Sequence, residues 1–325
     1  MTETCLVATE KENVLIQSGN CLIRIVPQLG GKIASIRVMG RELLQAPLAP
    51  LAPRTRTMAF EQGDAGGWDE CLPSVAPCSV ETMAGRADIP DHGDVWRVAW
   101  DQVSTNGSVV LRAECFSLPL VLDRSIQLRE DGQKWHLELD YKLTNTGDFP
   151  VPWSWSAHPL FATEPGDQIL LPASITKLRI EASGGGRLGV AGNSVDWPIA
   201  TLADGSRSDL GMVQSPESHI GDKVFAGPLS ASENWCALYR PSAGVRIKVS
   251  FDPPATPYLG LWICNGGWPD RPGPKQTCVA LEPSTAPTDS LAITGPWSRV
   301  LAPGECFSWT LSVDFEKIQV LKNYA

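Results

Sequence analysis

The sequence predicts an all-β protein, a sandwich of large antiparallel sheets, and three observations support this prediction. Apolar and polar residues alternate along several segments, which is the pattern of half-buried antiparallel strands. No segment carries the i, i+3, i+4, i+7 apolar stripe of a long amphipathic helix. Glycine and proline are frequent, with 29 and 27 residues, and they mark many turns. Strands spaced in this way along 325 residues indicate a sandwich with few short helical turns.

The predicted strands are spread along the whole chain. Residues 21–26 and 108–116 are expected to be strands in its first third, and three later segments alternate most clearly. Residues 134–143 place on one face Trp135, Leu137, Leu139, Tyr141 and Leu143. In residues 244–251, one face carries Val245, Ile247, Val249 and Phe251. In residues 307–315, one face carries Phe307, Trp309, Leu311, Val313 and Phe315. Turn pairs lie between such segments at Asn106-Gly107, Asp131-Gly132, Thr146-Gly147, Asp204-Gly205 and Asn265-Gly266.

Residues 1–325 are expected to form a single domain. No internal repeat, charge block or Ser/Gly-rich linker divides the chain. The proline-rich segment that ends at Arg54 is interpreted as an irregular loop within this domain.

Composition and charge exclude several classes of partner. The formal net charge is −9 and no Lys/Arg stripe is present, so we expect no nucleic-acid partner. No apolar run approaches the ~18 residues of a membrane-spanning helix, so no membrane partner is expected. Residues 1–17 show no signal-peptide pattern, and nine cysteines without a C-x-x-C pair fit a reducing cytoplasm. We therefore expect a cytoplasmic protein without metal or cofactor, and the sequence leaves its oligomeric state open.

Several motifs are weak. Gly184, Gly186 and Gly189 match G-x-G-x-x-G, but the residues that follow do not favour a helix, so nucleotide binding is not predicted. No G-x-S-x-G or H-E-x-x-H motif supports a serine hydrolase or a zinc protease.

Two of the four histidines lie in a setting typical of functional loops. His92 and His158 each stand in an irregular segment near tryptophan, glycine or proline, and the alternative for each is a structural role. His136 is expected to be a solvated side chain on a strand, and His219 remains undecided. The chain has 12 tryptophans, a residue that packs in cores and also stacks on sugar rings.

Three carboxylates are candidates for chemistry. Asp69 and Glu70 follow Trp68 in a segment bounded by glycine and proline, and Glu282 ends an apolar run before Pro283. A carboxylate just beyond a buried strand can be partly desolvated, which raises its pKa. The alternative is that all three are solvated surface or turn residues. Adjacent residues of an extended segment point to opposite sides, so the choice between Asp69 and Glu70 as a ligand stays open.

Five regions, in order along the chain, resemble the galactose mutarotase (aldose 1-epimerase) superfamily. They are GGKIASIRVMGRELL (30–44), GGWDECLPS with PDHGDVW (66–74 and 90–96), WSWSAHPLF (153–161), SHIGDKVFAG (218–227) and ALEPSTAPTDSL (280–291). The resemblance implies a β-supersandwich with a concave groove that binds a monosaccharide. It also implies mutarotation, in which a base takes the C1 hydroxyl proton, an acid protonates the ring oxygen, and the opened sugar recloses on its other face.

The resemblance implies a role for each matching residue. Glu282 would be the base and His158 the acid, kept protonated by a neighbouring carboxylate or hydroxyl that raises its pKa. His92 would polarise the ring oxygen. The predicted sugar contacts are completed by Asp222, Asp69, Glu70, Trp68 and Trp155.

The chain departs from the family where an Asn-Arg pair would stand near residues 68–70. Two acids there would repel a phosphorylated sugar, although Arg54, Arg56, Arg86 or Lys223 could hold a phosphate. Two other functions stay open: a non-catalytic sugar-binding protein on the same fold, and a glycosidase or lyase. A glycosidase would use two carboxylates, Asp69 or Glu70 together with Glu282.

Overall fold

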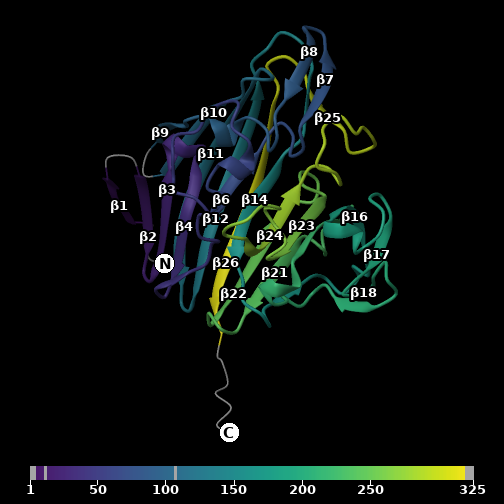
Figure 1. Ribbon diagram of the computed structural model, residues 1–325. Helices are drawn as coiled ribbons and strands as arrows, with labels where there is room; N and C mark the ends of the chain where they lie inside the picture. The colour runs from purple at the N-terminus through teal and green to yellow at the C-terminus, as the bar shows by residue number, and fades with distance from the viewer. Residues whose placement is uncertain (1–4, 11–12, 106–107, 319–325) are drawn as a thin grey trace.

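The computed structural model describes residues 5–10, 13–105 and 108–318 (Figure 1). Within these ranges the chain forms 26 strands and five short 3-10 turns, and no α-helix. The predicted turn at Asn106-Gly107 lies outside the described residues. Among the described residues there is also no helix long and apolar enough to cross a membrane.

The larger sheet has 12 strands among the described residues, and the paired strands are antiparallel. Its order is β1 (Cys5–Glu10), β2 (Asn13–Ser18), β3 (Cys21–Val26), β4 (Lys32–Val38), β6 (Trp68–Cys71), β14 (Ser156–Ala162), β24 (Thr277–Ser284), β23 (Tyr258–Asn265), β20 (Ile220–Ala226), β16 (Lys177–Ser183) and β17 (Ser194–Asp196), with β5 (Arg41–Glu42) beside β4. Its centre therefore joins segments that are far apart in the sequence.

The smaller sheet confirms the predicted alternation. It has eight strands within the described ranges, in the order β15 (Gln168–Leu170), β21 (Trp235–Arg240), β22 (Val245–Phe251), β26 (Cys306–Lys317), β12 (Lys134–Asn145), β11 (Leu120–Asp131), β10 (Ser108–Glu114) and β9 (Asp101–Thr105). The predicted apolar faces of β12, β22 and β26 are buried, with Phe307 half-buried, and the residues between them remain partly exposed.

Three two-stranded sheets and five 3-10 turns complete the described structure. Two of these sheets are hairpins, β7 (Cys78–Thr82) with β8 (Gly85–Ile89) and β18 (Ile199–Thr201) with β19 (Arg207–Asp209), and the third pairs β13 (Val151–Trp153) with β25 (Arg299–Leu301). The turns are η1 (Pro27–Leu29), η2 (Phe60–Gln62), η3 (Val95–Arg97), η4 (Gly184–Gly186) and η5 (Pro216–Ser218). The β7–β8 hairpin projects at the top of Figure 1.

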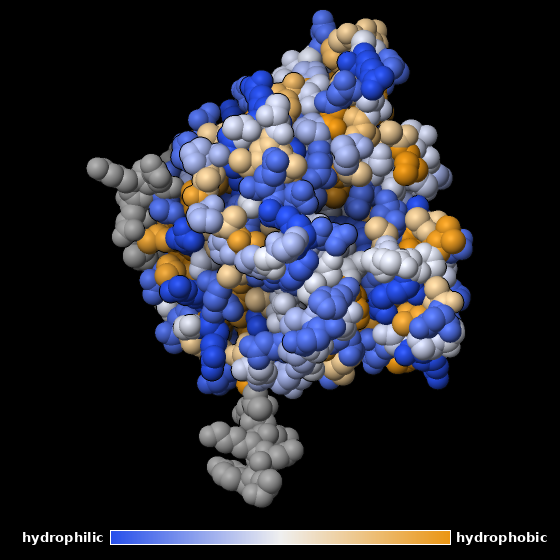
Figure 2. Space-filling model, viewed as in Figure 1, coloured by the Kyte–Doolittle hydropathy of each residue, from blue (hydrophilic) through white to orange (hydrophobic). Residues whose placement is uncertain are grey.

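The main core lies between the two sheets. Apolar side chains from both sheets form one buried cluster, which includes Ile23 and Trp68 of the larger sheet and Leu139 and Leu311 of the smaller one. Burial of this apolar surface is the main stabilising contribution to such a fold. On the face drawn in Figure 2, apolar residues are scattered among polar ones.

The central strands of the larger sheet are buried on both faces. Nearly every residue of β14, β20 and β24 is buried, with no alternation of exposure. One face of these strands packs on the inter-sheet core. The other face is covered by loops, and between the loops and the strands lies a cavity.

Candidate active site

A cavity of about 410 Å³ lies over the second face of β14, β24, β23 and β20. A volume of this size is in the range of small-ligand pockets. Its polar side chains come from the sheet and from several loops that cover it, and its apolar wall includes three aromatic rings. The lining residues are Ala59, Phe60, Glu61, Val75, Ala76, Pro77, Asp91, His92, His158, Ala182, Lys223, Trp262, Trp268, Gln276, Glu282 and Asp289.

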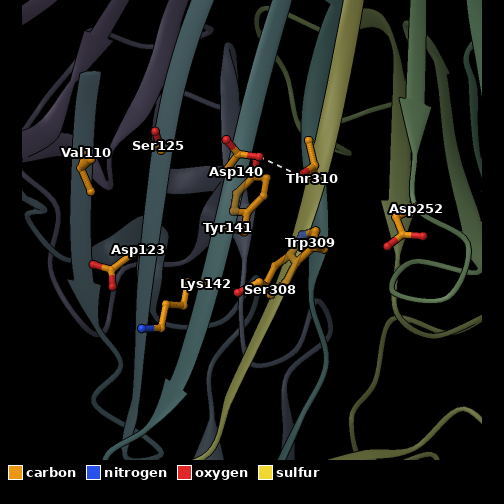
Figure 3. A pocket seen from close by; sticks show the side chains of 10 residues that line it. All are labelled: Val110, Asp123, Ser125, Asp140, Tyr141, Lys142, Asp252, Ser308, Trp309 and Thr310. Atoms are coloured by element: carbon orange, nitrogen blue, oxygen red, sulfur yellow. Dashed lines mark hydrogen bonds between the residues drawn. The ribbon is translucent and has the colours of Figure 1, made fainter. Parts of the chain in front are cut away.

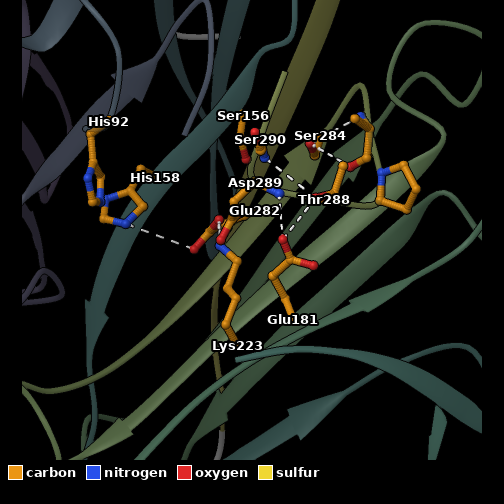
Figure 4. Close-up of polar contacts among 12 residues, drawn as sticks. His92, Ser156, His158, Glu181, Lys223, Glu282, Ser284, Thr288, Asp289 and Ser290 are labelled. Atoms are coloured by element: carbon orange, nitrogen blue, oxygen red, sulfur yellow. Dashed lines mark hydrogen bonds and ion pairs between the residues drawn. The ribbon is translucent and has the colours of Figure 1, made fainter. Parts of the chain in front are cut away.

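Strand register brings the predicted catalytic pair together. On β14 and β24, Ser156 lies opposite Ser284 and Leu160 opposite Ala280, so His158 and Glu282 occupy the row between them on the same face. His158 Nε2 is 4.0 Å from Glu282 Oε1 (Figure 4). The structure therefore places both residues at the floor of one cavity, 124 positions apart in sequence.

A lysine that sequence analysis left uncertain completes the floor. Lys223 on β20 forms an ion pair with Glu282 Oε2, and its Nζ lies 3.5 Å from Asp289 Oδ1 (Figure 4). The strand between them carries Gly260 opposite Glu282. A methyl group at Gly260 would lie 3.3 Å from Glu282 Oε2 and 3.1 Å from the Phe225 ring, so glycine leaves room for this pair.

His92 lies above the floor in the loop after β8. Its backbone is left-handed, with φ of 58°, and its ring stacks on Phe60 at 3.9 Å between centroids. The same ring meets His158 edge-on at 5.1 Å, and Nδ1 lies 3.0 Å from Asp91 Oδ1. The structure thus brings the two predicted histidines side by side.

Burial controls the ionisation of the pair. Burial raises the pKa of Glu282, while Lys223 opposes this rise and Asp289 adds to it. Burial also lowers the pKa of His158 well below its ordinary value, and the charges of His92 and Lys223 lower it further. The expectation that a neighbouring group keeps His158 protonated is therefore wrong, because desolvation and nearby cations dominate.

Two charged neighbours share the floor. Burial raises the pKa of Asp289, and Lys223 opposes this. Burial disfavours the ammonium of Lys223, but Asp289 and Glu282 outweigh it and raise the Lys223 pKa above its usual value. Lys223 is therefore a cation held between two carboxyl groups.

Aromatic rings that sequence analysis did not single out form the wall. Trp262 and Trp268 are half-buried, and the Trp268 ring lies 6.3 Å from that of Phe60. Trp262 Nε1 donates to Gln276 Oε1 at 2.9 Å, which fixes the indole. Such faces suit the C–H groups of a sugar ring. The spacing of these tryptophans around Asn265-Gly266 was the available signal in the sequence.

Asp69 and Glu70 are both structural. Asp69 is opposite His158 in the pairing of β6 with β14, but its carboxylate binds Lys32 at 2.7 Å and Arg54 at 3.0 Å. Glu70 points to the inter-sheet core, where it accepts hydrogen bonds from Arg124 and Tyr141, each at 2.9 Å. Neither lines the cavity, so the structure does not support either as a sugar ligand.

Three other predicted contacts also lie away from the cavity. Trp68 and Trp155 are fully buried in the core, and Trp155 Nε1 donates to Glu70 at 3.1 Å. Asp222 precedes Lys223 on β20 and therefore faces the opposite side, where it binds Ser183 at 2.6 Å and Arg187 at 2.7 Å. These positions correct the sugar-binding set predicted from the sequence.

The arginines named as a phosphate clamp do not line the cavity either. Arg54 is buried and pairs with Asp64 and Asp69, while Arg86 pairs with Asp88 on the exposed β7–β8 hairpin. Arg56 packs over the Phe116 ring at 5.0 Å. Among the described residues that line the cavity, Lys223 is the one lysine or arginine.

At the cavity floor, three polar atoms of the described chain lack a hydrogen-bond partner. Within the described part of the chain, His158 Nδ1, Glu282 Oε1 and Asp289 Oδ1 are buried and have no hydrogen-bond partner. Buried polar groups are normally paired, so these atoms mark where hydroxyl groups could bind. The floor can thus accept and donate protons on a polyhydroxylated ligand.

A second depression, also about 410 Å³, lies on the outer face of the smaller sheet (Figure 3). Apart from the buried Tyr141 and Trp309, its lining residues are partly or fully exposed, and Thr310 donates to Asp140 at 2.7 Å. Asp123 at its edge pairs with exposed Arg112 at 2.7 Å. These are solvated surface pairs, and no catalytic constellation forms among them. No group of three or more potential metal ligands occurs among the described residues.

Comparison with known proteins places the fold. No protein-family model and no curated protein matches the sequence. A protein from Synechocystis sp. PCC 6803 superposes with a TM-score of 0.67 at 18% identity, covering 97% of this chain and 96% of that one. A candidate aldose 1-epimerase from Escherichia coli K12 gives 0.65 at 19% identity, covering 94% and 98%. A galactose mutarotase related enzyme from Lactobacillus acidophilus gives 0.64 at 14% identity, covering 94% and 99%. The galactose mutarotase-like β-sandwich predicted from the sequence is therefore confirmed as the fold.

Proposed function

We propose that the protein is an aldose 1-epimerase, an isomerase that interconverts the α and β anomers of a free monosaccharide. One observation carries this proposal. Glu282 and His158 approach to 4.0 Å at the floor of an aromatic-walled cavity, and among the described residues each has a buried polar atom without a partner. Fold alone would not support a function, but this arrangement supplies an acid–base pair and a sugar platform together.

The reaction needs only proton transfers and a bond rotation. Glu282 takes the proton of the C1 hydroxyl while His158 gives a proton to the ring oxygen, and the C1–O5 bond breaks to leave the open aldehyde. After rotation about C1–C2, the C5 hydroxyl attacks the other face of the aldehyde. His158 then takes back the proton and Glu282 returns its own to the C1 oxygen. No cofactor enters this sequence of steps.

The pair must hold one proton between its two members. A raised pKa of Glu282 and a lowered pKa of His158 bring the two proton affinities toward each other. The raised pKa makes the Glu282 carboxylate a stronger base, and the lowered pKa makes His158 a stronger acid in the state in which it carries the proton. Ring opening and ring closing are the two halves of this exchange.

The cavity favours an uncharged sugar. Its lining carries the carboxyl groups of Glu61, Asp91, Glu282 and Asp289, against the single ammonium of Lys223. This excess of acids would repel a phosphate or a carboxylate on the substrate. Phe60, Trp262 and Trp268 would stack on the apolar face of the ring, and His92 would bind a hydroxyl beside the ring oxygen.

Polarimetry tests the proposal directly. Wild-type protein is expected to accelerate the decay of optical rotation of freshly dissolved α-D-glucose or α-D-galactose. Glu282→Gln and His158→Asn should each lose about 10²-fold or more of this rate, as expected for general acid–base groups. His136→Asn, on the outer face of β12, is the matched control and should keep the wild-type rate.

The alternatives give different outcomes. A non-catalytic binding protein would bind these sugars in calorimetry and leave the polarimetric decay unchanged. A glycosidase would release reducing ends from an oligosaccharide. The two-carboxylate arrangement expected for it is not supported, because Asp69 and Glu70 are held in buried ion pairs away from the cavity.

A further inference from the structure

We propose that Lys223 is a positioning residue, shared between Glu282 and Asp289, which holds the Glu282 carboxylate ionised and aimed at the sugar. The inference rests on the proposed function of Glu282 as the base. It adds Lys223 as the group that stabilises the ionised form of this buried carboxyl. Lys223 itself would not exchange protons with the substrate.

The ion pair is confined by its surroundings. The Lys223 side chain is 7% exposed and that of Glu282 is fully buried. The ammonium binds Glu282 Oε2, which leaves Oε1 directed toward His158 and the cavity. One oxygen of the carboxylate is therefore anchored, and the other is free to meet the substrate.

Asp289 is held in place by the backbone around it. Its amide N donates to Glu181 Oε1 at 3.0 Å, and Thr288 Oγ1 donates to the same oxygen at 2.9 Å (Figure 4). The Asp289 carbonyl accepts from Val75 N at 2.9 Å and from Ala76 N at 2.7 Å. The distance of 3.5 Å between Asp289 Oδ1 and Lys223 Nζ is therefore a fixed feature of the cavity.

The titratable groups that face Glu282 come from five directions and do not act alike. His158 lies on β14, Lys223 on β20, Asp289 in the loop after β24, His92 in the loop after β8, and Cys71 on β6. Lys223 favours the carboxylate of Glu282, while Asp289 disfavours it. Asp289 also competes for the same ammonium, so it weakens the effect of Lys223 on Glu282.

This arrangement argues against a lysine that attacks the open-chain aldehyde. A nucleophilic amine must be unprotonated, which requires a lowered pKa. The two carboxyl groups instead keep Lys223 as an ammonium. Its action on the reaction is therefore electrostatic and passes through Glu282.

Opposite shifts in two variants test the inference. The side-chain carboxyl carbon of Glu282 would be titrated by ¹³C NMR in glutamate-labelled protein, with the signal assigned by its loss in Glu282→Gln. Lys223→Met is expected to raise the Glu282 pKa by about 1–3 units, because an opposite charge at contact distance is removed. Asp289→Asn should lower the Glu282 pKa by a smaller amount, since Lys223 then forms an ion pair with Glu282 alone. Lys223→Arg should stay closest to wild type.

The pH profile of mutarotation supplies the functional readout. The limb of kcat/KM that reports Glu282 should move in the same direction as the NMR titration in each variant. Shifts of the Glu282 pKa with the same sign in Lys223→Met and Asp289→Asn, or no shift in either variant, would overturn the inference. Either result would mean that the charges of Lys223 and Asp289 do not control the ionisation of Glu282. If Lys223→Met does not fold, the Glu282 pKa in Asp289→Asn still decides, because the inference requires it to fall.

Failure of the proposed function would look different. Wild-type protein that shows the opposite NMR shifts but no mutarotation would overturn the epimerase proposal and leave Lys223 as the group that keeps Glu282 ionised. Mutarotation without those shifts would overturn the role of Lys223 and leave the epimerase proposal standing.

Discussion

Single-residue placement decides which polar groups reach the cavity. Asp222 and Lys223 are neighbours on β20, and only Lys223 faces the floor. Similarity to a family segment suggested Asp222. Adjacent side chains of a strand point to opposite faces, and similarity alone does not show which of the two neighbours faces the cavity. The same alternation separates Asp69 from Glu70. The resemblance to the family suggested His92, His158 and Glu282, while local sequence misplaced two of them: His158 lies within β14 and not in an irregular segment, and Glu282 lies within β24 and not beyond the end of a strand.

The lowered pKa of His158 predicts a loss of stability in mild acid. In the unfolded chain this imidazole gains a proton near its ordinary pKa of about 6.5, while in the folded chain it stays neutral to lower pH. The unfolded state therefore binds more protons below about pH 6.5, and the free energy of unfolding falls as pH falls. The loss continues until the pH reaches the folded-state pKa.

Urea unfolding at pH 7.5 and at pH 5.5 measures this effect. Wild type should lose up to about 1.4 kcal/mol per pH unit more than His158→Gln, which cannot titrate. His136→Gln is the comparison, since it also removes one histidine but from the outer face of β12. Equal pH dependence in wild type and His158→Gln would show that burial does not lower the imidazole pKa.

At the scale of the strand, regular alternation was predictable and two-sided burial was not. β12, β22 and β26 each pack one face on the core and leave the other partly exposed, so their sequences alternate. β14, β20 and β24 are covered on both sides, and their sequences carry no such pattern. The loops that cover them, and the wall of Phe60, Trp262 and Trp268, arise from contacts between segments distant in sequence, which no local pattern records.

Gly260 on β23 is expected to be required for the geometry of the floor. A Cβ atom there would lie 3.1 Å from Phe225 and 3.3 Å from Glu282 Oε2, closer than most side-chain contacts. Gly260→Val would push the Glu282 carboxylate from its position between Lys223 and His158. Displacement of a reacting group by about 1 Å can cost about 10²-fold in rate, so mutarotation should fall by that order.

The comparison variant for Gly260→Val is Lys248→Val on β22. It introduces the same side chain at a partly exposed position of the smaller sheet and should leave the polarimetric rate unchanged. Circular dichroism would verify that both variants fold. A folded Gly260→Val protein with wild-type rate would contradict the idea that this glycine makes room for the ion pair.

For the whole molecule, the cavity depends on how the two sheets are joined. Glu70 of the larger sheet lies in the core and binds Arg124 of β11 and Tyr141 of β12, while Trp155 also donates to it. Arg124 packs over the Trp100 ring at 4.7 Å and donates to the Gly31 carbonyl. The Glu70 carboxyl and its donors therefore connect strand β6 to the opposite sheet. Glu70 is the neighbour of Asp69 in sequence, and β6 pairs with the strand that carries His158. The expectation that residues 1–325 form one domain stays a prediction.

Removing one partner of this buried pair should destabilise the whole sandwich. Arg124→Met leaves the Glu70 carboxyl in the core with only Tyr141 and Trp155 as donors, and loss of one member of a buried pair costs about 3–5 kcal/mol. The free energy of unfolding in urea should fall by that amount, with Arg112→Met on the exposed face of β10 changing it by less than about 1 kcal/mol. The double variant Arg124→Met with Glu70→Leu should recover much of the loss, because no unpaired charge remains in the core. If the double variant is instead as unstable as the sum of the two single variants, the ion pair does not act as a unit, and the two sheets are held together by apolar packing alone.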